Sequence, residues 1–228
     1  MEELSSSELR VLGSLIEKEA TTPDQYPLSL NALLMACNQT SNREPVVNYD
    51  QETVLDAADT LRQKQLVRLI YPAHGRVNKY RHVMGETMAL TAPELAVLAV
   101  LMLRGPQTLN ELKTRTERYA ADFDDLSGVE GVLDRLAGRP EPLSVRIERR
   151  PGQREDRYAH LLAGEPDLSM LSGSAGSDSG GGGGGGAGGG GGSQSERQSR
   201  LDQLEEEVRQ LRADLDELRR QLADLLES

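Results

Sequence analysis

The apolar positions between residues 48 and 70 follow the spacing of an amphipathic helix that leads into a strand. Val54, Leu55, Ala58 and Leu61 lie at i, i+1, i+4 and i+7, which places them on one side of a helix. The opposite side carries Glu52, Asp56, Asp59, Thr60 and Gln63. Residues 66–71 ("LVRLIY") then favour a strand. In a helix-turn-helix unit this helix would face the DNA major groove, but its polar side has three carboxylates and no basic residue.

Two blocks recur in the same order later in the chain. "LSSSELRVLGSL" (4–15) and "LTAPELAVLAVL" (90–101) are identical at six of twelve positions, and both begin with a Ser/Thr-x-x-Glu capping box. "PLSLNAL" (27–33) and "PQTLNEL" (106–112) share a second helix start, with Ser29 and Thr108 as predicted N-caps. A third helix follows each time, so the sequence predicts an internal duplication.

Each predicted third helix is followed by two extended segments around a turn. "LVRLIY" (66–71) and "VNKYRHV" (77–83) flank Pro72-Ala73-His74-Gly75, and "LSVRIERR" (143–150) and "DRYAHLL" (156–162) flank Pro151-Gly152. Three helices and a hairpin, repeated once, predict two tandem winged helix-turn-helix domains at residues 4–85 and 86–165. The predicted fold class is α+β, mostly α.

The last quarter of the chain has a different pattern. Residues 180–192 are glycine except for Ala187, and we expect residues 166–199 to be a flexible Gly/Ser-rich linker. Residues 200–227 then carry four heptads with an apolar residue at every a and d position, which predicts a coiled coil through which the chain self-associates. Its strand number and orientation stay open. The heptad residues are Leu201, Leu204, Val208, Leu211, Leu215, Leu218, Leu222 and Leu225.

Composition limits the partners and the location of this chain. The net charge of the 228 residues is −11, and neither predicted domain is globally basic, which argues against tight non-specific binding to nucleic acid. A single cysteine, Cys37, fits a reducing compartment. The start, "MEELSSSELR", has no apolar run, so we expect a cytoplasmic protein without a membrane partner.

Four long blocks of this sequence resemble the YceH-like proteins of bacteria. They are "YPLSLNALLMACNQTSNREPVVNYD" (26–50), "GRVNKYRH" (75–82), "LRGPQTLNEL" (103–112) and "PGQREDRYAHLL" (151–162). The resemblance spans roughly residues 4–163. It implies a cytosolic protein with two winged-helix domains, and the family has no assigned activity.

No catalytic constellation is present in the sequence. Cys37 lies on an apolar helix face with no histidine nearby, which favours a core residue over a nucleophile. His74, His82 and His160 do not have the spacing of a metal site. We therefore expect a protein that is not an enzyme and that needs no cofactor or metal.

The candidate interaction residues are basic side chains of the wings and of the run "NQTSNREP" (38–45). This run either donates to phosphates or caps and turns between helices. Together the candidates predict a non-enzymatic regulatory or adaptor protein, and any contact that it makes with DNA is expected through its wings. The alternative is a scaffold that binds a protein through the acidic face Glu52, Asp56 and Asp59. The basic candidates are Arg43, Arg68, Arg76, Lys79, Arg81, Arg149, Arg150, Arg154 and Arg157.

Overall fold

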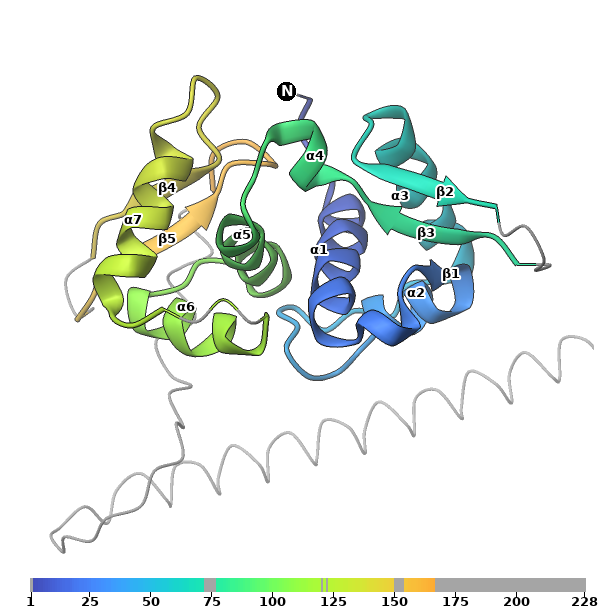
Figure 1. Cartoon of the computed structure of the whole chain (residues 1–228), viewed down its shortest axis with the longest axis horizontal. Helices are drawn as coiled ribbons and strands as arrows, with labels where there is room; N and C mark the ends of the chain where they lie inside the picture. Colours follow the sequence, from blue (N-terminus) through green and yellow to red (C-terminus); the bar gives the residue numbers. More distant parts are fainter. Residues whose placement is uncertain (1, 72–76, 120, 122, 150–153, 167–228) are drawn as a thin grey trace, which may run out of the picture. The chain divides into compact units, whose positions relative to one another are not determined.

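The computed structural model describes residues 2–71, 77–119, 121, 123–149 and 154–166 (Figure 1). The described residues belong to one compact unit, Met1–Gly176. Nearly all of the predicted linker and the whole predicted coiled coil lie outside the described residues. Within them the fold is α+β and mostly helical, with two small antiparallel sheets.

The first half follows the predicted order of three helices and a hairpin, with three additions, one of which is the single 3₁₀ turn η1. A short strand precedes the second helix and pairs with β3, so the sheet order is β1-β3-β2. A one-turn helix, α4 (Met84–Met88), follows the hairpin. The other elements are α1 (Ser6–Thr21), η1 (Pro23–Gln25), β1 (Leu28–Ser29), α2 (Leu30–Cys37), α3 (Gln51–Gln63), β2 (Val67–Ile70) and β3 (Lys79–His82).

The second half repeats the order of three helices and a hairpin, with its 3₁₀ turn after the second helix. Its elements are α5 (Ala92–Arg104), α6 (Leu109–Thr116), η2 (Glu117–Tyr119), α7 (Leu126–Ala137), β4 (Ser144–Ile147) and β5 (Arg157–His160). Leu28 pairs with Tyr80 in the first sheet, and Gln107 forms the matching bridge to Tyr158 in the second. The two halves therefore share the order of their main elements, and in each of them the segment before the second helix pairs with the second strand of the hairpin.

The predicted helix starts are confirmed by their caps. The Ser5 backbone N–H donates to Glu8 Oε2 at 2.7 Å, and the Thr91 backbone N–H donates to Glu94 Oε2 at 2.8 Å. The hydroxyl of Ser29 accepts from the backbone N–H of Ala32 at 3.3 Å. Thr108 forms a third capping box with Glu111. Each cap satisfies backbone donors that the first turn of a helix leaves without a partner, so the sequence signal has a direct physical cause.

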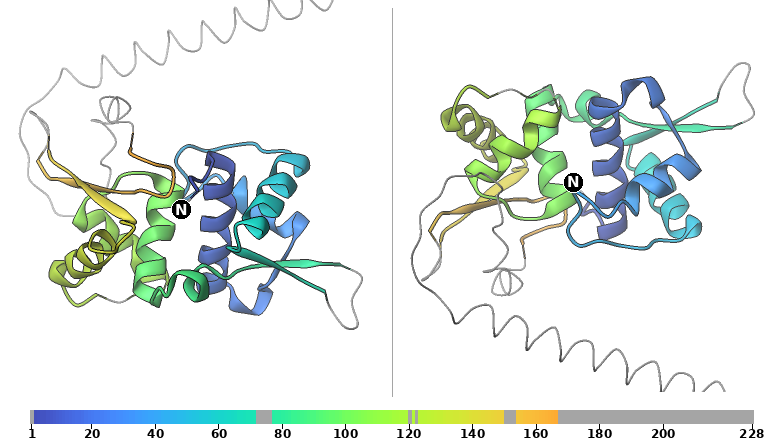
Figure 2. Two further views of the ribbon diagram at one scale, coloured as in Figure 1. Left: turned by 90° about the horizontal axis from the view of Figure 1, so that it is seen from above. Right: turned by 90° about the horizontal axis from the view of Figure 1, so that it is seen from below.

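The first helices of the two halves pack against each other, and the views from above and below agree on this (Figure 2). Gly13 of α1 faces α5 so closely that an added Cβ would lie 2.9 Å from Leu103 Cγ and 3.3 Å from Met102 Cβ. Buried side chains of α1 and α5 belong to one hydrophobic core that continues through both halves. Glycine at position 13 is thus what lets the two helix backbones approach.

The capping glutamates also connect each first helix to the end of its own third helix. Glu8 Oε1 lies 2.9 Å from Lys64 Nζ at the C-cap of α3, and Glu94 Oε1 lies 3.3 Å from Arg135 Nε in the last turn of α7. Basic side chains are favoured at these helix ends because the last carbonyl groups have no partner within the helix. The same arrangement in both halves keeps each third helix in register with its first helix.

Candidate interaction site

The exposed face of α3 is acidic, as the pattern of apolar positions predicts. Glu52 and Asp56 are exposed, and Asp59 forms an ion pair with Arg62 whose Oδ1–Nη1 distance is 2.6 Å. The opposite side packs into the core through Val54, Ala58 and Leu61, all of which are fully buried. The helix therefore presents carboxylates to solvent.

The basic side chains of the first hairpin are partly neutralised by α4. Arg68 Nη1 lies 3.2 Å from Glu86 Oε2, and Arg81 Nη2 lies 2.6 Å from Glu86 Oε1. Lys79 is exposed, and no carboxylate among the described residues pairs with it. Arg76 lies outside the described residues. Since one carboxylate serves two guanidinium groups, the hairpin keeps a smaller positive charge than its sequence suggests.

Arg146 and Arg149 of the second hairpin both bind the carboxylate of Asp156, which belongs to the same hairpin. Arg146 forms an ion pair with Asp156 across the two strands, and its Nε donates to Asp156 Oδ2 at 2.9 Å. The backbone N–H of Arg149 donates to Asp156 Oδ1 at 2.9 Å. The hydrogen bond from Arg149, followed by the one from Arg146, holds the pKa of Asp156 below its usual value. The carboxylate therefore stays ionised and fixes both strands.

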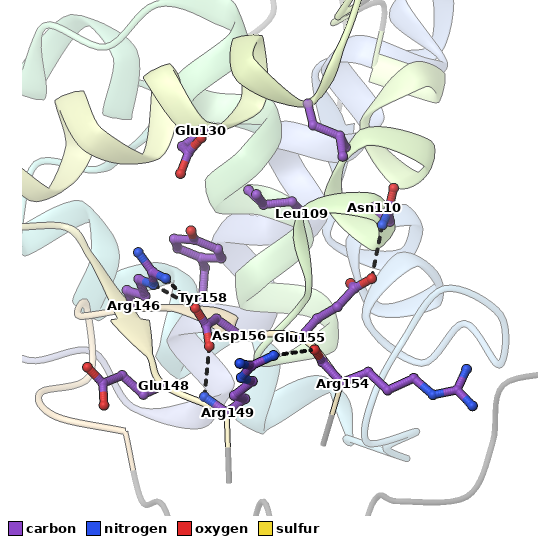
Figure 3. A pocket seen from close by; sticks show the side chains of 11 residues that line it. Leu109, Asn110, Glu130, Arg146, Glu148, Arg149, Arg154, Glu155, Asp156 and Tyr158 are labelled. Atoms are coloured by element: carbon purple, nitrogen blue, oxygen red, sulfur yellow. Dashed lines mark hydrogen bonds and ion pairs between the residues drawn. The ribbon is translucent and has the colours of Figure 1, made fainter. Parts of the chain in front are cut away.

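A groove of about 650 Å³ lies between the start of α6, the start of α7 and this hairpin (Figure 3). Leu126, which is 37% exposed, lies on one wall, and Tyr158 lies at the hairpin. Asn110 of α6 donates to Glu155 Oε1 at 3.3 Å across one end. The charged residues of the lining are four carboxylates (Glu130, Glu148, Glu155, Asp156) and three guanidinium groups (Arg146, Arg149, Arg154).

Arg43 is a correction to the predicted set of surface contacts. Its side chain is fully buried and forms an ion pair with Glu17 of α1, with Nη1–Oε1 and Nη2–Oε2 distances of 3.2 and 2.5 Å. Its Nη2 also donates to the backbone carbonyl of Ala36 at 2.9 Å. A guanidinium with these partners is not available to a phosphate, so Arg43 holds the 38–45 loop against α1. Of the two interpretations of this run, the structural one applies to Arg43.

The remaining predicted contacts of the second hairpin are Arg150 and Arg157. Arg157 does not line the groove, and it forms an ion pair with Glu111 of α6 at an Nη1–Oε2 distance of 3.3 Å. Arg150 lies outside the described residues. The groove therefore brings together only Arg149 and Arg154 of the predicted basic residues.

Comparison with known proteins places the sequence in a family. A family model described as "Protein of unknown function, DUF480" matches residues 4–153. The chain belongs to the DUF480 family. A UPF0502 protein of Geotalea daltonii is 55% identical over 166 residues, which cover 73% of this chain and 75% of the relative. A UPF0502 protein of Pseudomonas paraeruginosa is 49% identical over 175 residues, or 77% of each chain.

The expectation of an uncharacterised bacterial family is thereby confirmed. In this DUF480 chain, no group of three or more potential metal ligands occurs within the residues that the structure describes. No helix in the same residues is long and apolar enough to cross a bilayer. Cys37 is fully buried, and burial raises the pKa of its thiol to about 11, so it belongs to the core as predicted.

The groove of the DUF480 chain includes residues that sequence reasoning did not single out. Arg146 and Asp156 are positions of two predicted strands, and their pairing became visible only with the register of β4 and β5. Leu126 precedes the amphipathic pattern of α7 and is held at the helix start because Asp125 caps the backbone N–H of Gly128 at 3.0 Å. The signal that the sequence offered for Leu126 was an apolar residue at the first position of a helix, where the side chain is exposed.

His160 is expected to make the stability of this DUF480 chain depend on pH. Burial lowers the pKa of its imidazole from 6.5 to about 4, so the folded state disfavours protonation. We expect the free energy of unfolding to be fully retained above about pH 6.5 and to fall as the pH drops towards 4, by roughly 3 kcal/mol at most. Urea unfolding of wild type and His160→Gln at several pH values measures this contribution of His160 to the free energy of unfolding. Equal pH slopes for the two proteins would contradict it.

Proposed function

We propose that this protein is a non-enzymatic, tandem winged-helix adaptor of the YceH-like kind, and that its partner is another protein. The observation that carries the proposal is the lining of the groove between α7 and the second hairpin. Duplex DNA docked there would bring its phosphates against Glu130, Glu148 and Glu155. A protein segment can instead bury Leu126 and pair with side chains of both signs.

The first half supports the same proposal. The third helix of a DNA-binding winged helix normally offers donors to base edges, whereas α3 offers the acidic face Glu52, Asp56 and Asp59. Glu86 also offsets the charge of Arg68 and Arg81 in the first wing. These features favour a protein partner over the competing function, a DNA-associated regulator that contacts phosphates through its wings.

The proposed adaptor also self-associates through its C-terminal heptads, from Leu201 to Leu225. This part of the proposal rests on the sequence pattern alone, because the heptads lie outside the described residues. Two copies joined in this way would present two grooves, which strengthens binding to a partner that carries repeated or symmetric sites.

The groove is tested by placing a charge on its apolar wall. Leu126→Arg should abolish or strongly reduce capture of the partner, because the exposed Leu126 side chain is the apolar anchor of the groove. Ala137→Arg is the matched control, since Ala137 is an exposed residue of the same helix outside the groove. Quantitative pull-downs from a bacterium that carries the chain should yield proteins retained by wild type and Ala137→Arg and lost with Leu126→Arg. Identical retention of these proteins by all three chains would contradict the proposal that the groove binds the partner.

A DNA-binding measurement separates the two functions. Fluorescence anisotropy with random-sequence duplex at low and physiological salt should show at most weak binding that disappears with added salt. Tight binding whose log–log salt slope falls by about 0.9 for each of Arg68, Lys79 and Arg81 changed to Ala would establish the DNA-associated regulator instead.

A further inference from the structure

A second cleft, of about 310 Å³, lies where the 38–45 loop of the first half meets the second half. Three arginines gather there: Arg104 at the end of α5, Arg115 in α6 and Arg118 in η2. The remaining lining residues are Asn42, Val100, Leu103, Thr114 and Tyr119. The cleft shares no lining residue with the groove beside the second hairpin.

The guanidinium group of Arg104 is only partly satisfied by hydrogen bonds within the protein. Its Nη1 donates to Asn42 Oδ1 at 2.9 Å, but its Nε is buried and has no acceptor among the described residues. Burial, followed by the nearby charge of Arg115, lowers the pKa of Arg104. Two guanidinium groups of like charge near one cleft are unfavourable, and an anion between them would relieve this repulsion.

The carboxylates around the cleft are too few to neutralise its arginines. Arg118 shares Glu17 with Arg43, at a distance of 3.3 Å for Arg118 Nη2 to Glu17 Oε1. Arg115 shares Glu111 with Arg157, and both distances are 3.3 Å. Among the described residues no carboxylate forms an ion pair with Arg104, and the more distant charges of Glu44 and Glu111 offset its lowered pKa only in part. The cleft therefore concentrates positive charge in a protein whose net charge is −11.

We propose that this cleft binds a dianionic phosphate group, either free or at the end of a small ester. Guanidinium groups match tetrahedral oxyanions because each offers several N–H donors in a fixed plane. The cation–π contact of Arg118 with the Tyr119 ring, at 5.9 Å, helps to orient one of these planes. The volume of the cleft is at the lower end of the range for small-molecule sites, which suits a phosphate and a few further atoms.

Binding would also connect the two halves of the protein. Asn42, which bonds Arg104, belongs to the loop that Arg43 fixes to α1, and the Glu44 backbone N–H donates to the Leu103 carbonyl at 2.8 Å. An anion held by Arg104 and Arg115 would stabilise this junction through mass action, since the unfolded chain does not offer the same donors together.

Isothermal titration calorimetry of the full chain with inorganic phosphate, and separately with glycerol 3-phosphate, tests the site at an ionic strength held constant with chloride. We expect saturable binding of at least one of the two, and the tighter one identifies the form of the ligand. Arg104→Lys keeps the charge but replaces the planar guanidinium group with a single ammonium group, and should weaken binding about tenfold. Arg115→Gln should weaken it to a similar degree while leaving the buried contacts of Arg104 in place.

The matched control is Arg62→Gln, which removes one exposed arginine of α3 outside the cleft and should bind as wild type does. No saturable heat with either compound in the wild type would overturn the proposal. So would equal affinity of wild type, Arg104→Lys and Arg115→Gln. A short DNA duplex that bound through Arg104 and Arg115 while both small phosphates failed would assign the cleft to a nucleic-acid backbone, and would likewise overturn it.

Discussion

Changing Glu17 to Gln is expected to destabilise the protein by about 3–5 kcal/mol. The carboxylate and the Arg43 guanidinium are both fully buried, at an Nη2–Oε2 distance of 2.5 Å, and Arg118 approaches the same carboxylate. Removing the negative charge leaves the Arg43 charge in the interior without its counterion, and the desolvation cost of that charge is then no longer offset. The midpoint of urea unfolding, monitored by circular dichroism, measures the loss.

The double variant Glu17→Gln with Arg43→Met should recover a large part of that loss, because replacing both partners removes the isolated charge. Arg62→Ala is the surface control. It breaks the exposed pair with Asp59 and should change the free energy of unfolding by less than about 1 kcal/mol. A cost below about 1 kcal/mol for Glu17→Gln would mean that water or another group compensates Arg43, and the pair would not be the anchor of the 38–45 loop.

Changing Gly13 to Leu should destabilise the protein by about 3 kcal/mol. An added Cβ would already lie 2.9 Å from Leu103 Cγ, which is buried, and the rest of a leucine side chain would push α1 away from α5. The gain of roughly 1 kcal/mol in helix propensity would not offset this overlap. Thermal and urea unfolding of the two proteins measure the difference.

Gly131→Ala is the matched control, because it also replaces a glycine within a helix. A Cβ at position 131 would meet only Arg135 Nη1, at 3.7 Å, so this variant should gain roughly 0.5–1 kcal/mol. If Gly13→Leu were as stable as wild type, the conclusion that α1 and α5 pack closely at Gly13 would be wrong.

The sequence predicted the local parts of this fold well because they depend on neighbouring residues. Capping boxes at Ser5 and Thr91 join groups three residues apart, and both formed as expected. The amphipathic pattern of α3 likewise placed Val54 and Leu61 in the core. Short elements were missed: β1 has two residues and depends on pairing with β3, which lies about 50 residues later.

The interaction surfaces were harder to predict because charge depends on spatial partners. Arg43 looked like an exposed donor, but its partner Glu17 is 26 residues away on another helix. Arg68 and Arg81 looked like an unopposed basic pair, but α4 brings Glu86 to both. In each case the sequence shows that the side chain is positively charged. Only the tertiary fold determines whether a carboxylate neutralises that charge or leaves it available at the surface.

The contact at Gly13 also limits what else can pack against α1 and α5. The first helices of the halves occupy equivalent positions, so their packing resembles the self-complementary interface of a twofold homodimer, enclosed within a single polypeptide. An interface of that kind is closed, because the faces of α1 and α5 that meet there bury each other. A further repeat would find that face already buried, in contrast to solenoid proteins, whose open ends accept repeat after repeat.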